Sequence, residues 1–395
     1  MPKVTGIIAE YDPLHLGHVY QLEEARRLSS SDVTIAVISG NFTQRGEPAI
    51  VDKWVRAEMA LRAGLDLVAE MPFIFACNNA GYFAQSGVEI LEALGADYIS
   101  FGSETADVET LQEAADARKE LSYEQFQDIR GLVKEGVSYP RALTMVLGEE
   151  KAFGPNDTLA VEYMRHMESA RPLPVMRKGA GHGELREEEG MASATMIRKE
   201  LLRSGSVESI RTFVPEATAE ILLREQKAHG FADPEKLVPY IRARAAAMDR
   251  TDLNGIYGAE EGLGSILKEN FRYKETYEEL AEALKSKRYT RTRVQRVLIH
   301  TLMNLTKDDI MEAGNYIRIL GFSDKGAEYL KALKKADRVG LPIIDNIKKD
   351  LKDHPWLRRT FELDIKASDI YNTIYGRDLY ANSEYVKKPL KLQAK

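Results

Sequence analysis

The feature that most constrains the fold is residues 11–18, which join an apolar, strand-like segment to a helical one. Residues 4–9 are β-rich and apolar, whereas residues 19–28 show helical periodicity. The turn between them carries His15 and His18 on either side of a glycine. A glycine lets a ligand approach the backbone, and the free amides at a helix N-terminus attract phosphate. The sequence therefore predicts a nucleotide-binding turn between a strand and a helix.

The two histidines are the first candidates for catalysis. A single histidine is more often a surface or core residue than a catalyst, but two of the seven histidines lie here three residues apart around Gly17. Beside a phosphate, imidazoles can donate hydrogen bonds to phosphoryl oxygens and to charge that develops at the α-phosphorus. Glycine-rich dinucleotide and Walker sequences are absent, which argues against NAD enzymes and P-loop enzymes. We assign His15 and His18 as candidate catalytic residues.

Strand and helix signals alternate through the first 205 residues. Further strands are expected at residues 33–38, 65–70, 97–102 and 173–178, with helices at 52–63 and 81–94. Such alternation is typical of an α/β fold with a mostly parallel sheet, on which ligands lie beyond the carboxyl ends of the strands. We expect this domain to span residues 1–205, with a helical insertion at about 107–150. Helical periodicity dominates afterwards, which predicts a mainly α-helical C-terminal domain over residues 206–395.

The composition is that of a globular protein. Of the 395 residues, 44% are hydrophobic and 29% are charged. The single cysteine, Cys77, excludes an intramolecular disulfide and a cysteine-rich zinc site, and it fits a reducing compartment. No apolar run is long enough to suggest a membrane span, and no signal peptide is visible. We expect a cytoplasmic protein with no membrane partner, and no cluster of acidic residues identifies a protein metal site.

One segment has a charge opposite to that of the whole chain. The formal net charge is −6, yet residues 285–307 contain seven Lys or Arg residues and no Asp or Glu. Binding to nucleic acid depends on local basic surface more than on total charge. The segment is therefore a candidate polyanion-binding site.

A second phosphate-binding helix start is expected at residues 193–198. The hydroxyls of Ser193 and Thr195 ordinarily serve as helix caps. Together with Arg198 they could also hold a leaving pyrophosphate, because the helix dipole and a guanidinium both attract anions.

Three further residues are candidates for contacts with the nucleotide. Arg177 and Lys178 precede a glycine-rich loop and could meet a triphosphate from another side, although charged residues at strand ends are often only solvated. Asn156 could be a turn or N-cap residue, or it could hydrogen-bond the adenine or the ribose.

Residues 15–18 resemble the HxGH signature of the nucleotidyltransferase superfamily, which includes coenzyme adenylyltransferases and class I aminoacyl-tRNA synthetases. The resemblance implies adenylyl transfer from ATP on a Rossmann-like nucleotidyltransferase domain. Residues 193–198 resemble the second signature of the superfamily, which corresponds to the KMSKS loop of the synthetases, although Ala194 departs from the common double hydroxyl. Glu10 stands where coenzyme adenylyltransferases usually have a small residue. A carboxylate beside a triphosphate is costly unless it is paired, which argues against a second bulky phosphate ester; alternatively, Glu10 turns to solvent.

Longer segments resemble bacterial tRNA(Met) cytidine acetate ligases, namely residues 39–49, 52–54, 193–198 and 287–293. Their order and spacing extend the resemblance over nearly the whole chain. It implies a ligase that activates acetate with ATP as acetyl-adenylate, releasing pyrophosphate. The acetyl group then passes to the wobble cytidine of elongator tRNA(Met), which forms N4-acetylcytidine. Magnesium is expected to bridge the phosphates of the ATP.

The resemblance, together with the helix start at 193–198, gives a set of residues expected to bind ATP. The set is Ile7, Ile8, Ala9, Glu10, Tyr11, Asp12, Pro13, Leu14, His15, Leu16, Gly17, His18, Val19, Tyr20, Gly102, Asn156, Arg177, Lys178, Ser193, Thr195 and Arg198.

The basic segment is expected to bind RNA through Lys287, Arg288, Arg291 and Arg293, with Tyr289 stacked on an unpaired anticodon base. The alternative is that part of the segment is core and that its cations pair with acidic helices. In the segment 52–54, Lys53 could contact RNA, whereas Asp52 suits a helix N-cap and Trp54 suits the core. Two other functions remain open: a coenzyme or small-metabolite adenylyltransferase, and a non-catalytic RNA-binding protein that senses ATP.

Overall fold

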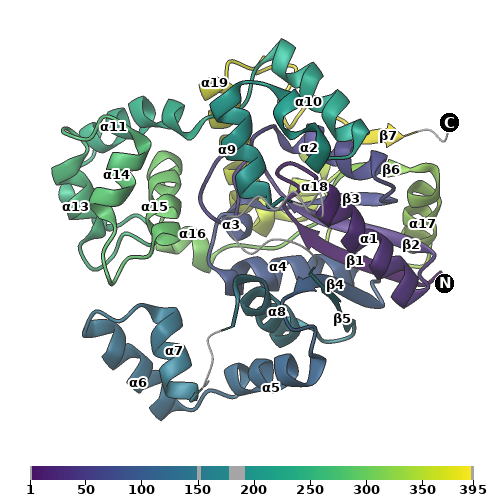
Figure 1. Cartoon of the computed structure of the whole chain (residues 1–395), viewed down its shortest axis with the longest axis horizontal. Helices are drawn as coiled ribbons and strands as arrows, with labels where there is room; N and C mark the ends of the chain where they lie inside the picture. The colour runs from purple at the N-terminus through teal and green to yellow at the C-terminus, as the bar shows by residue number, and fades with distance from the viewer. Residues whose placement is uncertain (1, 149–152, 178–191, 393–395) are drawn as a thin grey trace.

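A seven-stranded sheet lies at the centre of the molecule, with strand order β5-β4-β1-β2-β3-β6-β7. The computed structural model describes residues 2–148, 153–177 and 192–392 (Figure 1). The first five strands are β1 (Val4–Ala9), β2 (Val33–Ser39), β3 (Leu67–Met71), β4 (Tyr98–Ser103) and β5 (Arg171–Met176). They pair in parallel, so their carboxyl ends meet at one edge of the sheet. The expected α/β fold with a mostly parallel sheet is confirmed.

The central strands are apolar because both of their faces are covered. Every residue of β2 is buried, as is typical of a parallel strand packed between helices. Alternate residues of β1 enter different cores: Ile8 packs with Val88 and Leu91, and Ile7 packs with Leu22. Gly6 lets a helix approach closely, because a Cβ at that position would lie 2.6 Å from the side chain of Leu91.

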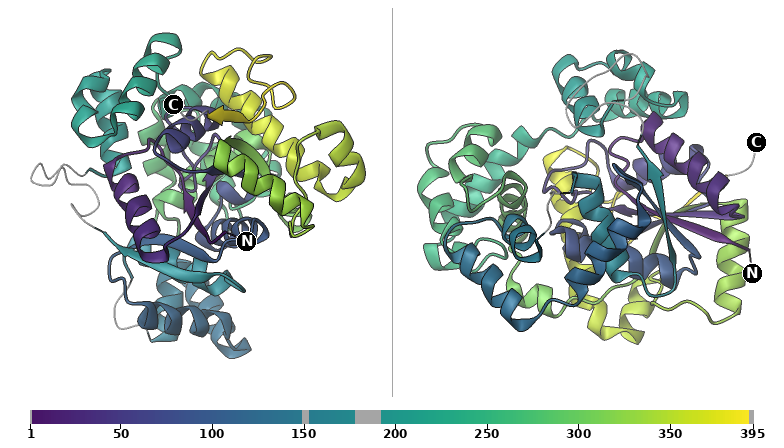
Figure 2. Two further views of the ribbon diagram at one scale, coloured as in Figure 1. Left: turned by 90° about the vertical axis from the view of Figure 1, so that its right-hand side faces the viewer. Right: turned by 60° about the horizontal axis from the view of Figure 1, so that its bottom comes forward.

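Helices cover both faces of the sheet (Figure 2). Residues of α1 (Leu16–Ser29), α2 (Lys53–Arg62), α9 (Ala194–Ser204) and α10 (Glu216–Ala228) share one hydrophobic core. Residues of α3 (Phe73–Ala76), α4 (Ala80–Ala93) and α8 (Pro155–His166) belong to the other. Between β4 and α8 the chain forms α5 (Val108–Lys119), α6 (Tyr123–Lys134) and α7 (Tyr139–Leu147). Helices α6 and α7 pack on each other around a small core of their own.

The C-terminal part of the chain is mostly helical, but it also completes the sheet. Helices α11 to α15 gather on one side of the sheet (Figures 1 and 2). The sequence pattern predicted no strand here, whereas β6 (Arg318–Ser323) pairs antiparallel with β3, and β7 (Leu390–Leu392) pairs with β6. Strand β7 has only three residues, and both strands are set by pairing with distant residues, which explains why a local pattern did not reveal them.

The remaining elements of this part are the helices α11 (Val238–Ala247), α12 (Arg250–Asn254), α13 (Leu263–Asn270), α14 (Tyr277–Leu284), α15 (Arg291–Met303), α16 (Lys307–Met311), α17 (Asp324–Lys335), α18 (Ile347–Asp353) and α19 (Arg358–Ile374), and the 3-10 helices η2 (Val207–Phe213), η3 (Pro234–Leu237) and η4 (Pro355–Leu357). Among the described residues, no helix has both the length and the apolar character needed to cross a membrane.

Candidate active site

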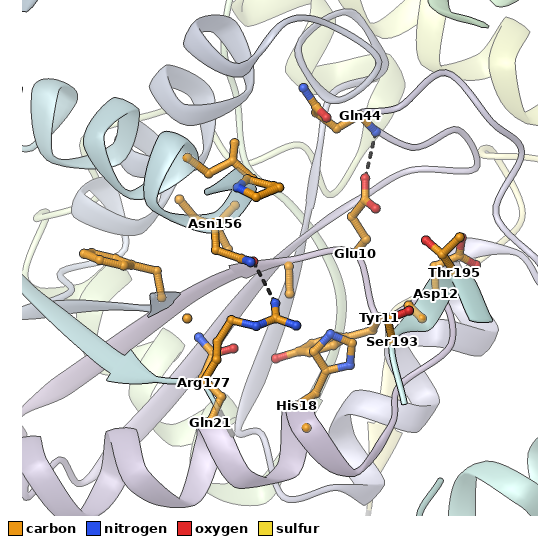
Figure 3. A pocket seen from close by; sticks show the side chains of 18 of the residues that line it. Glu10, Tyr11, Asp12, His18, Gln21, Gln44, Asn156, Arg177, Ser193 and Thr195 are labelled. Atoms are coloured by element: carbon orange, nitrogen blue, oxygen red, sulfur yellow. Dashed lines mark hydrogen bonds between the residues drawn. The ribbon is translucent and has the colours of Figure 1, made fainter. Parts of the chain in front are cut away.

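A cavity of about 600 Å³ opens at the carboxyl edge of the parallel strands. It is lined by residues from the β1–α1 turn, the ends of β4 and β5, and the first turns of α8 and α9 (Figure 3). Strand β1 lies between β2 and β4, so the strand order reverses at this point. Open α/β sheets bind ligands at such a switch point.

The two histidines begin α1, and both rings are held by the backbone of its first turn. His15 is the N-cap residue, and its Nδ1 accepts a hydrogen bond from the Gly17 amide at 3.1 Å. The Nδ1 atom of His18 accepts one from the His15 amide at 3.3 Å. Since each Nδ1 is an acceptor, each neutral ring carries its proton on Nε2. Both imidazoles line the cavity and are therefore available as Nε2–H donors.

The surroundings of the histidines keep them uncharged. Removal from water, with the nearby guanidinium groups of Arg177 and Arg198, lowers the pKa of His15 to about 3. Burial, together with His15 and Arg177, lowers the pKa of His18 well below its usual value. Neutral imidazoles can donate to phosphoryl oxygens without a change of protonation at neutral pH.

Asn156 and Arg177 form the facing wall of the cavity (Figure 3). The Arg177 guanidinium donates to Asn156 Oδ1 at 2.9 Å. The side-chain and backbone amides of Asn156 both donate to Glu104. Burial acts to raise the pKa of Glu104, but the hydrogen bonds from Asn156 and Asp157 outweigh it and hold that pKa below its usual range. Gly154, rather than Asn156, is the N-cap residue of α8, and the Asn156 amide is oriented by the ionised Glu104.

The start of α9 forms a third side of the cavity. Ser193 is the N-cap residue, and its hydroxyl accepts a hydrogen bond from the Met196 amide at 3.3 Å. Thr195 lines the cavity from the first turn of α9. Arg198 donates to the Asp12 carbonyl at 2.8 Å, and it lies 3.4 Å from a carboxylate oxygen of Glu47. Its side chain is only 12% exposed. The arginine that is expected to hold pyrophosphate is therefore largely buried and bound to two acidic residues.

Glu10 points into the cavity from the end of β1 (Figure 3). Its Oε1 accepts a hydrogen bond from the Gln44 amide at 2.7 Å. Burial and the nearby Asp12 raise the pKa of Glu10, against the lowering effects of the Gln44 bond and of Arg198. The alternative in which Glu10 turns to solvent is wrong, because the carboxylate is bound by a loop that lies beside the nucleotide cavity.

The cavity brings together many of the residues expected to bind ATP. They are Ile8, Ala9, Glu10, Tyr11, Asp12, His15, Gly17, His18, Tyr20, Gly102, Asn156, Arg177, Ser193, Thr195 and Arg198. Ile7 and Leu14 are buried in the core instead, and Pro13, Leu16 and Val19 do not line the cavity. Lys178 lies outside the described residues.

Local sequence patterns did not reveal several cavity residues. Phe83 and Tyr163 come from α4 and α8, and helical periodicity alone marks such residues as core. Phe101 could have been found, because it directly precedes Gly102 at the end of β4. These rings give one side of the cavity an apolar wall, which suits a flat heterocycle. The other missed residues are Gln21, Gln44, Arg45, Ala80, Pro155, Thr158, Leu159, Val175, Met176, Ala194 and Thr292.

The basic segment covers the turn before α15, all of that helix and the first residue of α16. The acidic partners of its arginines come from neighbouring elements: Arg291 lies 2.6 Å from Glu278, and Arg293 lies 3.6 Å from Glu261. Lys287 is exposed and forms no ion pair with any other described residue. Arg288 donates to the Lys134 carbonyl of α6 at 2.7 Å. Of the four residues expected to bind RNA, Lys287 and Arg288 are the two without an ion pair to another described residue.

Tyr289 cannot stack on a base in this structure. Its side chain is 4% exposed, and its hydroxyl donates to the Glu261 carbonyl at 2.6 Å. The Arg293 guanidinium covers the ring at 5.2 Å from its centre. The predicted stacking role is wrong, because this turn packs against residues near Glu261 and buries the ring.

The alternative in which Lys53 contacts RNA is also wrong. The ammonium group is 1% exposed and lies 2.7 Å from Glu70 and 2.6 Å from Glu384. Its neighbours have the roles that local pattern suggested: Asp52 caps α2 by accepting from the Val55 amide, and Trp54 is buried. Lys53 binds distant acidic residues that the local sequence could not reveal.

Comparisons with known proteins cover nearly the whole chain. The family model for HIGH Nucleotidyl Transferase matches residues 2–385. A protein of a Thermoanaerobacter species named tRNA(Met) cytidine acetate ligase is 37% identical over 414 residues, which covers 98% of this chain and 100% of that protein. A Bacillus licheniformis protein of the same name is 35% identical over 412 residues, or 98% of this chain and 97% of the relative.

Solved structures agree with these sequence matches. The crystal structure of apo Thermotoga maritima TmcAL superimposes with a TM-score of 0.90 at 33% identity, covering 99% of this chain and 100% of that one. The structure of Thermotoga maritima TmcAL bound with alpha-thio ATP gives a TM-score of 0.89 at 32% identity with the same coverage.

Proposed function

This chain belongs to the tRNA(Met) cytidine acetate ligase family of HIGH nucleotidyltransferases, and on that premise we propose that it joins acetate to tRNA(Met) with ATP. The observation that carries the proposal is the position of His15 and His18. Two neutral Nε2–H donors face a cavity that is also lined by the start of a second helix and by three arginines. A relative that aligns with this chain over nearly its whole length binds alpha-thio ATP.

In the proposed first step, a carboxylate oxygen of acetate attacks the α-phosphorus of ATP. The bond from that phosphorus to the bridging oxygen of pyrophosphate breaks, so acetyl-adenylate and pyrophosphate form. The catalytic demand is to hold the reactants in line and to stabilise charge on phosphoryl oxygens. The Nε2–H groups of His15 and His18 serve the α-phosphate, and the α9 N-terminus with Thr195 and Arg198 receives the pyrophosphate.

In the proposed second step, the exocyclic amine of the wobble cytidine attacks the acetyl carbon. AMP leaves with the oxygen that came from acetate, and the amine loses a proton as the amide forms. An acyl-phosphate anhydride has a good leaving group, which makes transfer to a weakly nucleophilic aryl amine feasible. The product is N4-acetylcytidine in elongator tRNA(Met).

The remaining cavity walls fit the other parts of ATP. We assign the apolar wall with Phe101 and Tyr163 to the adenine, and Asn156 with Arg177 to the ribose and phosphates. Among the described residues, no group of three or more His, Cys, Asp or Glu is placed to hold a metal ion. A magnesium ion bound together with the ATP would neutralise negative charge on the phosphates during the displacement.

The RNA site is proposed at Lys287, Arg288, Arg291 and Arg293. Thr292, in the first turn of α15, lines the nucleotide cavity, so an RNA bound at this turn would lie beside the activated acetyl group. The proposed location is the cytoplasm, where ATP and tRNA are present.

The proposal is tested with purified protein, ATP, labelled acetate and tRNA(Met). We expect label in the RNA, and none in a tRNA whose wobble cytidine is replaced. A coenzyme adenylyltransferase would release pyrophosphate only when its own small-molecule acceptor is added, whether or not acetate is present, and an ATP-sensing binding protein would release none. Absence of label from the wild-type tRNA, with either of those patterns, would overturn the proposed function.

A further inference from the structure

The loop between β2 and α2, residues 41–49, lies between the basic helix α15 and the nucleotide cavity. It is closed by its own backbone hydrogen bonds: the Thr43 amide donates to the Glu47 carbonyl at 2.9 Å, and the Ala49 amide donates to the Asn41 carbonyl at 3.0 Å. The Thr43 hydroxyl also donates to the Glu47 carbonyl, at 3.1 Å. The loop is therefore an ordered turn that can transmit a displacement.

Gly46 brings this loop into direct contact with α15. Its φ is +80°, and a Cβ there would lie 2.3 Å from the Arg296 amide nitrogen. Only glycine allows that approach together with that backbone conformation. The Tyr277 hydroxyl also donates to the Gly46 carbonyl, at 3.3 Å. The loop and α15 are thus packed backbone to backbone, with no side chain between them to absorb a movement.

Glu47 connects α15 to the arginine of the nucleotide site. Its Oε1 accepts a hydrogen bond from Gln295 Nε2 at 2.6 Å. Its Oε2 lies 3.4 Å from Nη2 of Arg198. Arg198 also donates to the carbonyl of Asp12, which belongs to the turn before α1. The Glu47 carboxylate therefore binds both a residue of α15 and a residue that lines the cavity.

A second set of contacts runs beside the first. Arg296 Nη1 donates to the Gln44 carbonyl at 3.1 Å, and the Gln44 amide donates to Glu10 Oε1 at 2.7 Å. Gln44 and Glu10 both line the cavity. Gln295 is thus connected to Arg198 through Glu47, and the next residue of α15, Arg296, is connected to Glu10 through Gln44.

We propose that Glu47 is a positioning residue that couples tRNA binding at α15 to the hold of Arg198 on the ATP phosphates. This inference rests on the proposed function, since it takes tRNA and ATP as the two ligands. An RNA that contacts the start of α15 displaces Gln295. Because the loop packs directly on α15 at Gly46, the loop moves with the helix. Glu47 then changes its distance to Arg198, whose guanidinium binds either this carboxylate or an anionic phosphate. Coupling of this kind is reciprocal: each ligand changes the affinity for the other by the same factor.

The test measures the affinity of the full chain for an ATP analogue with a methylene bridge between the α- and β-phosphates. The dissociation constant is determined with and without saturating tRNA(Met). In the wild type we expect the two values to differ by about fivefold or more. In Glu47→Gln and in Gln295→Ala we expect less than about a twofold difference, with unchanged RNA affinity. The double variant should lose no more coupling than either single variant, because both changes break one connection.

Matched controls are Glu220→Gln and Gln226→Ala. Glu220 pairs with Arg62 at 3.4 Å, and Gln226 donates to the Gly205 carbonyl, both away from the loop. These variants should keep the coupling of the wild type.

Acetyl transfer in the same preparations separates the two proposals. A wild type that makes no acetylated tRNA overturns the proposed function. An active wild type without coupling, or Glu47 and Gln295 variants that retain it, overturns the role of Glu47. If Glu47 had a purely structural role, its substitution would weaken analogue binding equally with and without tRNA. The ratio of the two dissociation constants would then equal that of the wild type, and this result would also overturn the proposed coupling.

Discussion

The rings of His15 and His18 stack on each other, with centroids 3.8 Å apart and planes inclined by 25°. Each ring uses Nδ1 to accept an amide of the same helical turn, so the pair presents two Nε2–H groups in a fixed arrangement. The strand-to-helix turn thus serves both as a helix cap and as a source of donors. Replacing either histidine removes its cap and its donor together, so activity and folding have to be measured on the same variant.

We expect His15→Ala and His18→Ala to reduce acetate-dependent pyrophosphate exchange by about 10²–10³-fold, as loss of a preorganised donor does at other sites. His18→Gln should retain more activity than His18→Ala, because its terminal amide can donate from a similar position. RNA affinity, measured by filter binding, should be unchanged. Exchange at the wild-type rate in both alanine variants would contradict the assignment, provided that circular dichroism shows folded protein.

The low pKa of His15 predicts an unusual pH dependence. In the unliganded protein the ring should stay neutral from pH 8 to pH 5, because its pKa is lowered to about 3. The unfolded chain takes up this proton near the ordinary value of 6.5. The folded state therefore binds fewer protons between these values, and stability falls as the pH decreases through this window.

Two measurements check this dependence. The imidazole C2–H resonance of His15 should show no titration above pH 5. The melting temperature of the wild type should fall more between pH 7.5 and pH 5 than that of His15→Gln. A midpoint near the ordinary value, or equal falls in the two proteins, would refute the expected neutral ring.

The ion pairs of α15 determine which of its charged side chains are expected to contribute to RNA affinity. Arg291 is bound by both carboxylate oxygens of Glu278, at 2.6 and 2.7 Å. Glu278→Gln should strengthen RNA binding, because it removes the bidentate partner of that guanidinium and leaves it with Glu282 at 3.4 Å. Lys287→Ala with Arg288→Ala should weaken binding and reduce the salt slope by about 0.7–0.9 for each phosphate that the protein no longer neutralises. Lys227→Ala, an exposed lysine of α10, is the control, and an equal effect of this change would indicate only non-specific attraction.

We expect substitution of Lys53 to reduce the stability of the protein strongly and to leave its RNA affinity unchanged. Its ammonium group lies between Glu70 and Glu384, so Lys53→Met would remove the ion-pair partner of the buried Glu70 and leave Glu384 with Arg318 at 3.1 Å. Loss of one partner of a buried pair costs about 3–5 kcal/mol. Arg62→Ala on the same helix breaks only partly exposed pairs with Glu58 and Glu220 and should cost about 1 kcal/mol or less. A Lys53→Met protein that is as stable as the wild type but binds RNA more weakly would contradict this account and would indicate that Lys53 contacts RNA.

The parts of the fold that depend on neighbouring residues were predictable. Asp52 caps α2 and Ser193 caps α9, as their positions before periodic segments indicated. Gly205 ends α9 in the left-handed conformation, as expected of a glycine after the last helical residue. The β1–α1 turn was predictable because strand, glycine and helix signals occur in one short segment.

The parts that depend on distant residues were not. Glu10 meets Gln44, Lys53 meets Glu384, and Arg291 meets Glu278, and none of these pairs is adjacent in sequence. The absence of acidic residues from 285–307 therefore overstated the free charge of α15, since its partners belong to other elements. Strands β6 and β7 were missed for the same reason, because pairing with β3 places β6 in the sheet and pairing with β6 places β7 there.

The central claim is that the histidine cavity makes acetyl-adenylate as the acetyl donor for tRNA. It is tested most directly by supplying acetate labelled with ¹⁸O in both carboxylate oxygens, together with ATP and tRNA(Met). The acetate oxygen that attacks the α-phosphorus remains on that phosphorus when the cytidine amine displaces AMP. Mass spectrometry should therefore find one ¹⁸O atom in each AMP, in amounts equal to the acetylated tRNA. Unlabelled AMP, or ¹⁸O found in inorganic phosphate or pyrophosphate, would contradict the account.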